Sequence, residues 1–180
     1  MAFDPIDQYS NYYKQIAYGG WSPCIEGNNQ YNLRPFPGSV VPNCVGFTVG
    51  RFNEIQRLND CIYLGSVNAE DMISLALSQG LEVGDKAVPG GVICWSSADQ
   101  GHCANIEEVR ASDEVLTSES GWNYSTAPAI KGFIRNKIGG AWYYGPGYIY
   151  QGIIYPPGTK FKTDKEYYAI WLNNEGVITL

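Results

Sequence analysis

The sequence has a single histidine, His102, among its 180 residues, and none of its five cysteines forms a Cys-x-x-Cys pair. Structural zinc sites normally draw on closely spaced Cys and His residues. We therefore expect no metal site, and no cofactor. One cysteine and one histidine that lie far apart in sequence are instead typical of a thiol nucleophile and its base.

Positive charge is also scarce. Lys and Arg number 12 against 18 Asp and Glu, which gives a net charge of −6, and no basic run occurs. Binding to nucleic acid or to an anionic membrane is therefore not expected. No stretch approaches the roughly 18–20 apolar residues that cross a bilayer. The N-terminal segment lacks the basic and apolar regions of a secretory signal, so we expect another factor to deliver the protein to any target outside a cell.

Apolar residues make up 44% of the chain, enough for the core of one domain, and Tyr (14), Trp (5) and Gly (21) are abundant. Aromatic residues and glycines in short segments favour strands and turns over helices. Sugar-binding surfaces also use aromatic side chains, but packing in the core and on strands accounts for most of them here.

Two helices are predicted before the strands begin. In residues 43–58 apolar side chains recur at spacings of three and four, which predicts a helix with Asn43 as its N-cap, buried on most sides. A second helix is predicted at 69–79, with Asn68 as its cap and Gly80 at its end.

From Val83 onward, short apolar runs separated by polar or glycine-rich turns predict an antiparallel meander. The expected strands cover residues 92–95, 101–109, 114–120, 141–144 and 148–154. Helices followed by strands predict an α+β fold.

Cys44 is the first candidate for chemistry, because it directly follows the predicted N-cap of the buried helix. The positive end of a helix lowers the pKa of a thiol below its usual value of ~8.5, and backbone N–H groups there can stabilise an oxyanion. The alternative interpretation of Cys44 is a small buried hydrophobic residue.

His102 opens a predicted strand after a polar turn, so its ring can face a cleft, although a purely structural histidine is the alternative. A base also needs an acceptor for its second ring nitrogen. Glu119 is the candidate acceptor, since it lies on the strand expected to pair with that of His102. Glu107 and Glu108 are the competing carboxylates, and we interpret both as solvated.

Two further cysteines, Cys94 and Cys103, flank the same polar turn. We expect them to lie opposite one another on adjacent strands, which is within reach of disulfide geometry. Both are predicted to be reduced and packed beside the strand of His102.

Three segments, in this order, resemble the CHAP family of peptidoglycan amidases and endopeptidases: PNCVGFTVGRFNEI, GGVICWSSADQGHCANIEEV and SESGW. The resemblance covers about residues 18–157. It implies a papain-like α+β fold in which N-terminal helices pack on an antiparallel β-sheet. We accordingly expect a catalytic domain at 1–157, with a turn-rich extension at 1–42, and a tail or further hairpin at 158–180.

The same resemblance makes Cys44 the nucleophile, His102 the base and Glu119 the acceptor that orients the base. Substrate contacts are expected from Asn43, Trp95 and Trp122.

The sequence departs from the family pattern at three places. Gly121 stands where many members carry Asn, so a fourth polar group is absent from that position. Asn105 stands where a branched aliphatic residue is usual. Residues 37–43 contain no carboxylate, so the calcium loop of some members is not expected.

The predicted activity is hydrolysis of a cell-wall amide by a Cys-His-Glu mechanism, as an N-acetylmuramoyl-L-alanine amidase or as an endopeptidase of stem peptides or cross-bridges. The segments are similar to those of phage lysins and tail-associated lysins that act on Gram-positive hosts. Peptidoglycan is thus the expected partner, together with other tail or lysin subunits. The expected place of action is the cell wall, reached from the host cytoplasm through a holin or on the virion tail.

Two alternatives stay open at this point. One is a non-catalytic module that keeps the fold and binds the wall or another virion protein. The other is a related thiol enzyme that forms transpeptides or acts on a different amide.

Overall fold

The computed structural model describes residues 44–56, 62, 64, 67–120 and 131–159, together with the backbone of four short N-terminal strands. The elements follow this order: β1 (Gln15–Ile16), β2 (Gly20–Trp21), β3 (Arg34–Phe36), β4 (Ser39–Val41), α2 (Cys44–Gln56), η2 (Ala69–Asp71), α3 (Met72–Ser78), β5 (Val83–Gly84), β6 (Val92–Ser96), β7 (His102–Ala111), β8 (Glu114–Glu119), β9 (Lys131–Ile138), β10 (Ala141–Trp142) and β11 (Ile149–Ile154).

Both predicted helices are present. Helix α2 begins at Cys44 and is buried over most of its surface, as its apolar periodicity predicted. The second predicted helix is divided into the 3₁₀ turn η2 and the α-helix α3, and Gly80 follows its C-terminus with a φ of 78°. Asn68 occupies the N-cap position, but its side chain makes no capping hydrogen bond.

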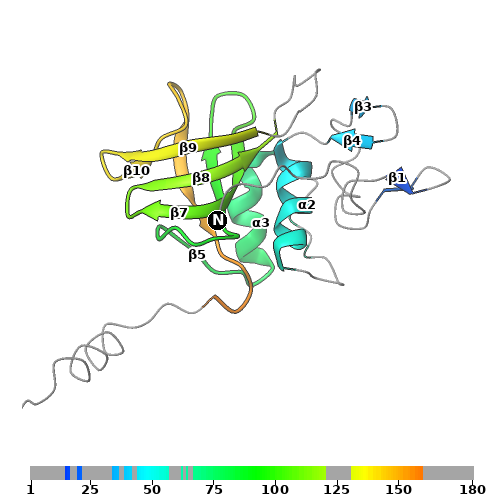
Figure 1. The fold of residues 1–180 in the computed structure, drawn as a ribbon, viewed down its shortest axis with the longest axis horizontal. Helices are drawn as coiled ribbons and strands as arrows, with labels where there is room; N and C mark the ends of the chain where they lie inside the picture. The colour runs from blue at the N-terminus through cyan, green and yellow to red at the C-terminus, as the bar shows by residue number, and fades with distance from the viewer. Residues whose placement is uncertain are drawn as a thin grey trace, which may run out of the picture.

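The main sheet has seven strands in the order β10-β9-β8-β7-β6-β11-β5, and every pairing in it is antiparallel. Strands β6 to β10 form an antiparallel meander, and α2 and α3 lie against the sheet (Figure 1). The predicted α+β class is therefore confirmed.

Two parts of the predicted strand pattern were wrong. Strand β9 was not predicted at all, and β11 returns to the other side of β6 instead of extending the meander. Gly139 and Gly140, which form the tight turn between β9 and β10, were a hairpin signal that could have revealed β9.

Alternation along the central strands divides the core into two clusters on opposite faces of the sheet. On β6, Val92 and Cys94 face the helices, whereas Ile93 and Trp95 face the opposite side. All four are buried. A strand covered on both faces reads as a continuous apolar run, which is why residues 92–95 show no polar alternation.

The sheet curls around the cluster on its far side from the helices. Trp95 on β6 donates its indole N–H to the backbone oxygen of Trp142 on β10, at 2.7 Å. Three strands separate β6 from β10 in the sheet order, so this bond requires the sheet to bend back on itself. One open end of this curl carries the start of β7 and the end of β8.

The structure gives a role to the polar side chain of Asn105, which stands where a branched aliphatic residue was expected. It lies on the helix side of β7, is fully buried, and donates from Nδ2 to the backbone oxygen of Thr48 at 3.2 Å. The polar side chain therefore ties the central strand directly to α2, where an aliphatic residue would provide packing alone.

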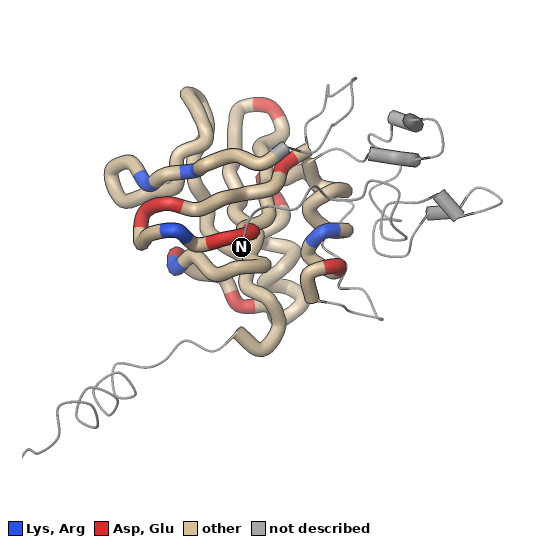
Figure 2. The backbone as a smooth tube through the Cα atoms, in the orientation of Figure 1, with Lys and Arg blue, Asp and Glu red and all other residues tan. Residues whose placement is uncertain are grey.

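Charged residues are sparse on the described backbone, and Figure 2 shows them singly or in short groups with no basic stretch. Within the same residues, no helix is long and apolar enough to cross a membrane.

We predict that Phe52→Ala lowers the free energy of unfolding by about 3–5 kcal/mol, because Phe52 is fully buried between α2 and the sheet. Leu77→Ala, at a position 55% exposed on α3, is the control and should change stability by less than about 0.5 kcal/mol. Urea denaturation followed by fluorescence measures both. Similar losses in the two variants would contradict the assignment of the core.

Candidate active site

Cys44 is the first residue of α2 and is partly exposed. Its side chain packs against the helix-side core cluster. A hydrogen bond with the Cys103 thiol, and then a hydrogen bond and the positive charge of His102, hold the pKa of Cys44 well below its usual value, against the opposing effect of burial. The start of the helix adds a favourable dipole for a thiolate.

His102 is the first residue of β7, on the strand face opposite Cys103, and only 6% of its surface is exposed. The preceding Gly101 has a φ of 71°, and a Cβ at this position would lie 2.3 Å from the backbone oxygen of Trp95. The chain can therefore turn into β7 at this point only with glycine. This turn places the imidazole at the open end of the curl, beside Trp95 and Tyr144.

The two ring nitrogens of His102 have different partners. Nε2 lies 2.9 Å from Oε2 of Glu119, which leaves Nδ1 for the hydrogen bond with Cys44. Burial alone would lower the pKa of His102, but the hydrogen bonds and negative charges of Cys44 and Glu119 raise it to about 9. The opposite shifts of the two pKa values favour the thiolate and imidazolium forms of the pair.

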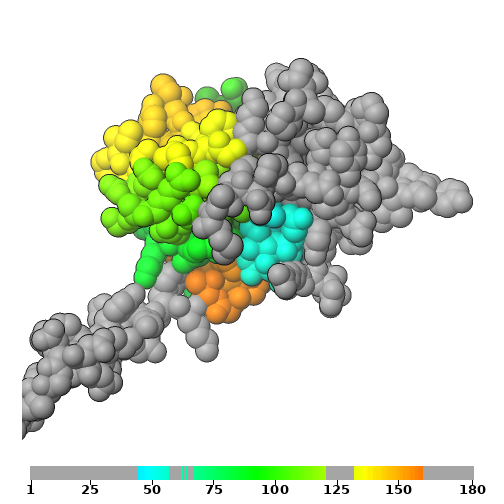
Figure 3. All heavy atoms as spheres, in the orientation of Figure 1, coloured from blue at the N-terminus to red at the C-terminus, as the bar shows by residue number. Residues whose placement is uncertain are grey.

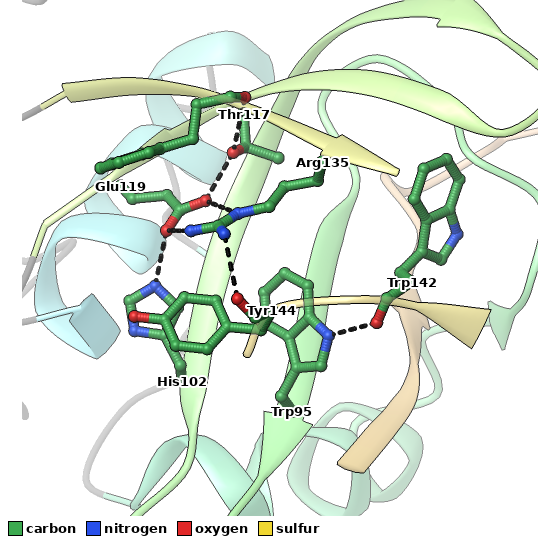
Figure 4. Close-up of polar contacts among 8 residues, drawn as sticks. Trp95, His102, Thr117, Glu119, Arg135, Trp142 and Tyr144 are labelled. Atoms are coloured by element: carbon green, nitrogen blue, oxygen red, sulfur yellow. Dashed lines mark hydrogen bonds and ion pairs between the residues drawn. The ribbon is translucent and has the colours of Figure 1, made fainter. Parts of the chain in front are cut away.

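Glu119 is the last residue of β8 and is 1% exposed. Each of its oxygens has more than one partner: Oε1 accepts from Thr117 Oγ1 at 2.6 Å and Arg135 Nε at 2.7 Å, and Oε2 accepts from Arg135 Nη2 at 2.6 Å beside its contact with His102. Burial would raise the pKa of Glu119, but hydrogen bonds and positive charges of His102 and Arg135 lower it to about 2. Figure 4 shows the carboxylate between the imidazole and the guanidinium.

The structure thus brings Cys44, His102 and Glu119 together as the sequence suggested, from the starts of α2 and β7 and the end of β8. Figure 3 shows α2 (cyan) beside the green part of the sheet on one face of the molecule. The sequence analysis did not find Arg135, because β9 was not predicted and an isolated arginine between apolar residues carries no motif.

The prediction that Glu107 is solvated was wrong. Its side chain is 12% exposed and accepts two hydrogen bonds from Arg51, at 2.8 and 2.7 Å, and one from the Ser118 hydroxyl at 2.6 Å. Glu107 faces α2, as Asn105 does two residues earlier, and strand alternation therefore carries it to the helix. Glu108 is more exposed, at 34%, and lies 3.5 Å from Arg110.

The predicted role of Trp95 in substrate binding does not agree with its position. Trp95 is fully buried in the curl of the sheet, where its ring supports those of His102 and Tyr144. Its indole N–H is already bonded to Trp142, so no surface of the side chain is left for a substrate. Asn43 and Trp122, the other two predicted contacts, lie outside the described residues.

Cys94 and Cys103 are directly opposed on β6 and β7, as predicted, and both are free thiols. Burial, and then the nearby Cys44, raises the pKa of each well above its usual value. Cys103 therefore remains a thiol and donates to Cys44. Most of the stretch 37–43, where no calcium loop was expected, lies outside the described residues; within the described part, no group of three His, Cys, Asp or Glu could hold a metal ion.

A partly exposed cysteine at a helix start, bonded to a histidine that a buried carboxylate orients, is the arrangement of a thiol-dependent hydrolase. Residues 34–121 match the CHAP domain family, and this span includes Cys44, His102 and Glu119. The helices packed on an antiparallel sheet agree with the predicted α+β fold.

A comparison with curated proteins gives no match. Among solved structures, the chain matches an N-acetylmuramoyl-L-alanine amidase from Staphylococcus aureus with 16% sequence identity and a TM-score of 0.43. The matched region covers 61% of this chain and 33% of that one, so it spans about a third of the amidase.

We predict that iodoacetamide modifies Cys44 faster than the other cysteines at neutral pH. Cys44 is partly exposed and has a lowered pKa, whereas Cys94 and Cys103 are buried with raised pKa values. Peptide mapping by mass spectrometry after brief labelling of the native protein identifies the site. Equal labelling of all five cysteines would argue against a thiolate at Cys44.

The second prediction for the site uses the fact that His102 is the only histidine. Its NMR titration should have a midpoint near a pKa of about 9, and Glu119→Gln should lower that midpoint, because the carboxylate favours the imidazolium. Glu108→Gln, on the partly exposed part of β7, is the control and should leave it unchanged. A midpoint near the ordinary value of 6.5 in the native protein would contradict the ion pair.

Proposed function

We propose that this protein is a cysteine-dependent peptidoglycan hydrolase that cleaves an amide bond of the cell wall. The observation that carries the proposal is the continuous line of contacts from the Cys44 thiol through the His102 ring to the Glu119 carboxylate, with 2.9 Å between Nε2 and Oε2. A non-catalytic module has no need for a buried carboxylate fixed on the outer nitrogen of a histidine. The CHAP family match supports the cell wall as the source of the substrate.

The first half of the reaction forms an acyl-enzyme. The Cys44 thiolate attacks the amide carbonyl carbon, and the charge moves to the carbonyl oxygen beside the first turn of α2. The imidazolium of His102 then gives its Nδ1 proton to the amide nitrogen. The C–N bond breaks, the amine leaves, and a thioester remains on Cys44.

The second half restores the enzyme. His102, now neutral, takes a proton from water as the water oxygen attacks the thioester carbonyl. The C–S bond breaks, the acid is released, and Cys44 leaves as a thiolate beside the re-formed imidazolium. Glu119 stays ionised throughout and fixes the tautomer of His102.

The finer assignments rest on the similarity of the three sequence segments. We propose a hydrolase of the phage lysin or tail-associated lysin type, acting on a Gram-positive wall, with residues 1–157 as its catalytic domain. The substrate bond is that of an N-acetylmuramoyl-L-alanine amidase or of a stem-peptide or cross-bridge endopeptidase. Access to the wall through a holin and transport on a virion tail both fit this assignment.

We predict that Cys44→Ala abolishes the clearing of purified Gram-positive cell walls, because the nucleophile is lost. Glu119→Gln should lower turnover by a factor on the order of 10²–10⁴, judging from acceptors in similar triads. Glu108→Gln should have little effect, since this side chain is partly exposed and lies beside Arg110. Loss of turbidity measures the rates, and mass spectrometry of the released fragments identifies the bond.

Circular dichroism serves as the control that each variant keeps its fold. Full activity of Cys44→Ala would overturn the mechanism. A folded native protein that clears no wall and releases no fragments would favour the non-catalytic alternative. An essential Glu108 with a dispensable Glu119 would overturn the role given to the acceptor.

A further inference from the structure

Arg135 contacts the two groups that surround the His102 ring. Its Nε and Nη2 donate to the two oxygens of Glu119, at 2.7 and 2.6 Å. Its Nη1 donates to the backbone oxygen of Tyr144 at 3.3 Å, and its guanidinium carbon lies 4.5 Å from the centre of the Tyr144 ring. Figure 4 shows these contacts meeting on one guanidinium.

The pairing of Arg135 with Glu119 is bidentate and almost excluded from water, with side chains 14% and 1% exposed. Two parallel N–H···O bonds fix both the position and the plane of a carboxylate, which a single contact cannot do. Oε2, which is held by Arg135 Nη2, is also the oxygen that meets His102 Nε2.

Tyr144 forms the second contact around the imidazole. Its ring centre is 4.3 Å from that of His102, and Trp95 lies near both rings, at 6.0 Å from His102 and 5.3 Å from Tyr144. Tyr144 follows β10 in a segment without regular structure. The bond from Arg135 to its backbone is therefore a direct tie between this segment and the sheet.

We propose that Arg135 is a positioning residue: it sets the plane of the Glu119 carboxylate and the place of the Tyr144 ring, and through both it fixes the His102 imidazole. The proposal deepens the proposed hydrolase function and rests on it for the effect on turnover. The sequence lacks the polar residue that many CHAP members carry at position 121. Arg135 supplies a fourth polar group to the site from a different strand.

The charged and titratable groups around His102 come from four elements or segments. They are Cys44 on α2, Glu119 on β8, Arg135 on β9, which acts through Glu119, and Tyr144 after β10. Removal of the guanidinium would leave Glu119 buried with His102 as its one cationic partner among them. The carboxylate would then be free to turn away from Nε2, and the support of Glu119 for the imidazolium would weaken.

The test compares two variants. Arg135→Met removes both the positive charge and the two parallel N–H donors, whereas Arg135→Lys keeps the charge but cannot donate two parallel hydrogen bonds. Thr117→Val is the comparison variant, because it removes an uncharged donor to the same carboxylate oxygen, together with the contact of that hydroxyl with the backbone oxygen of Phe133. NMR of the one histidine reports the hydrogen bond at Nε2 and the titration midpoint, and wall fragments of defined composition give kcat and KM.

We expect Arg135→Met to weaken the Nε2 hydrogen bond, to lower the midpoint of His102, and to reduce kcat by about 10²-fold with KM nearly unchanged, as for misplacement of a catalytic group. Arg135→Lys should recover only part of this loss. Thr117→Val should change each quantity less than Arg135→Lys does.

A folded Arg135→Met protein with the native His102 spectrum and native kcat would overturn the proposal and leave Arg135 a purely structural residue. Should that variant fail to fold, Arg135→Lys decides: native values for its spectrum and kcat overturn the proposal equally. If the native protein turns over no wall fragment, the proposed function fails, and the spectra of the variants still decide whether Arg135 positions His102.

Discussion

The hydrogen bond between His102 Nε2 and Glu119 Oε2 is the interaction on which the rest of the site depends. It assigns the other ring nitrogen to Cys44 and raises the pKa of the imidazole, so that the thiol can transfer its proton to the ring. A carboxylate buried to this extent is costly unless it is paired. Thr117 and Arg135 provide that pairing. The hydrogen bond between His102 and Glu119 is therefore supported by residues of β7, β8 and β9.

The architecture explains why these groups meet. The curl of the sheet brings the inward-facing side chains of β6 to β10 around one cluster, and the start of α2 lies against the outside of β7. His102 stands at the open end of the curl, where it can contact Glu119 within the sheet and Cys44 from the helix. Gly101 and Asn105 secure this geometry, one by permitting the turn into β7 and the other by tying β7 to α2.

The ionisable groups of the site are arranged so that negative and positive charges alternate. Thiolate, imidazolium, carboxylate and guanidinium follow one another from Cys44 to Arg135, so each ionised group has an opposite charge beside it. The neighbouring Cys94 and Cys103 are buried thiols whose raised pKa values keep them neutral.

The sequence by itself determined the local features: the helix that begins at Cys44, the strands around His102 and Glu119, and the opposition of Cys94 and Cys103. These follow from apolar periodicity and turn residues, which act over a few positions. Only the tertiary structure decided that Glu107 binds Arg51, that Trp95 is buried, and that Arg135 meets Glu119. Such contacts join strands and helices that are distant in the chain, and the curl of the sheet that creates them has no signature in any single segment.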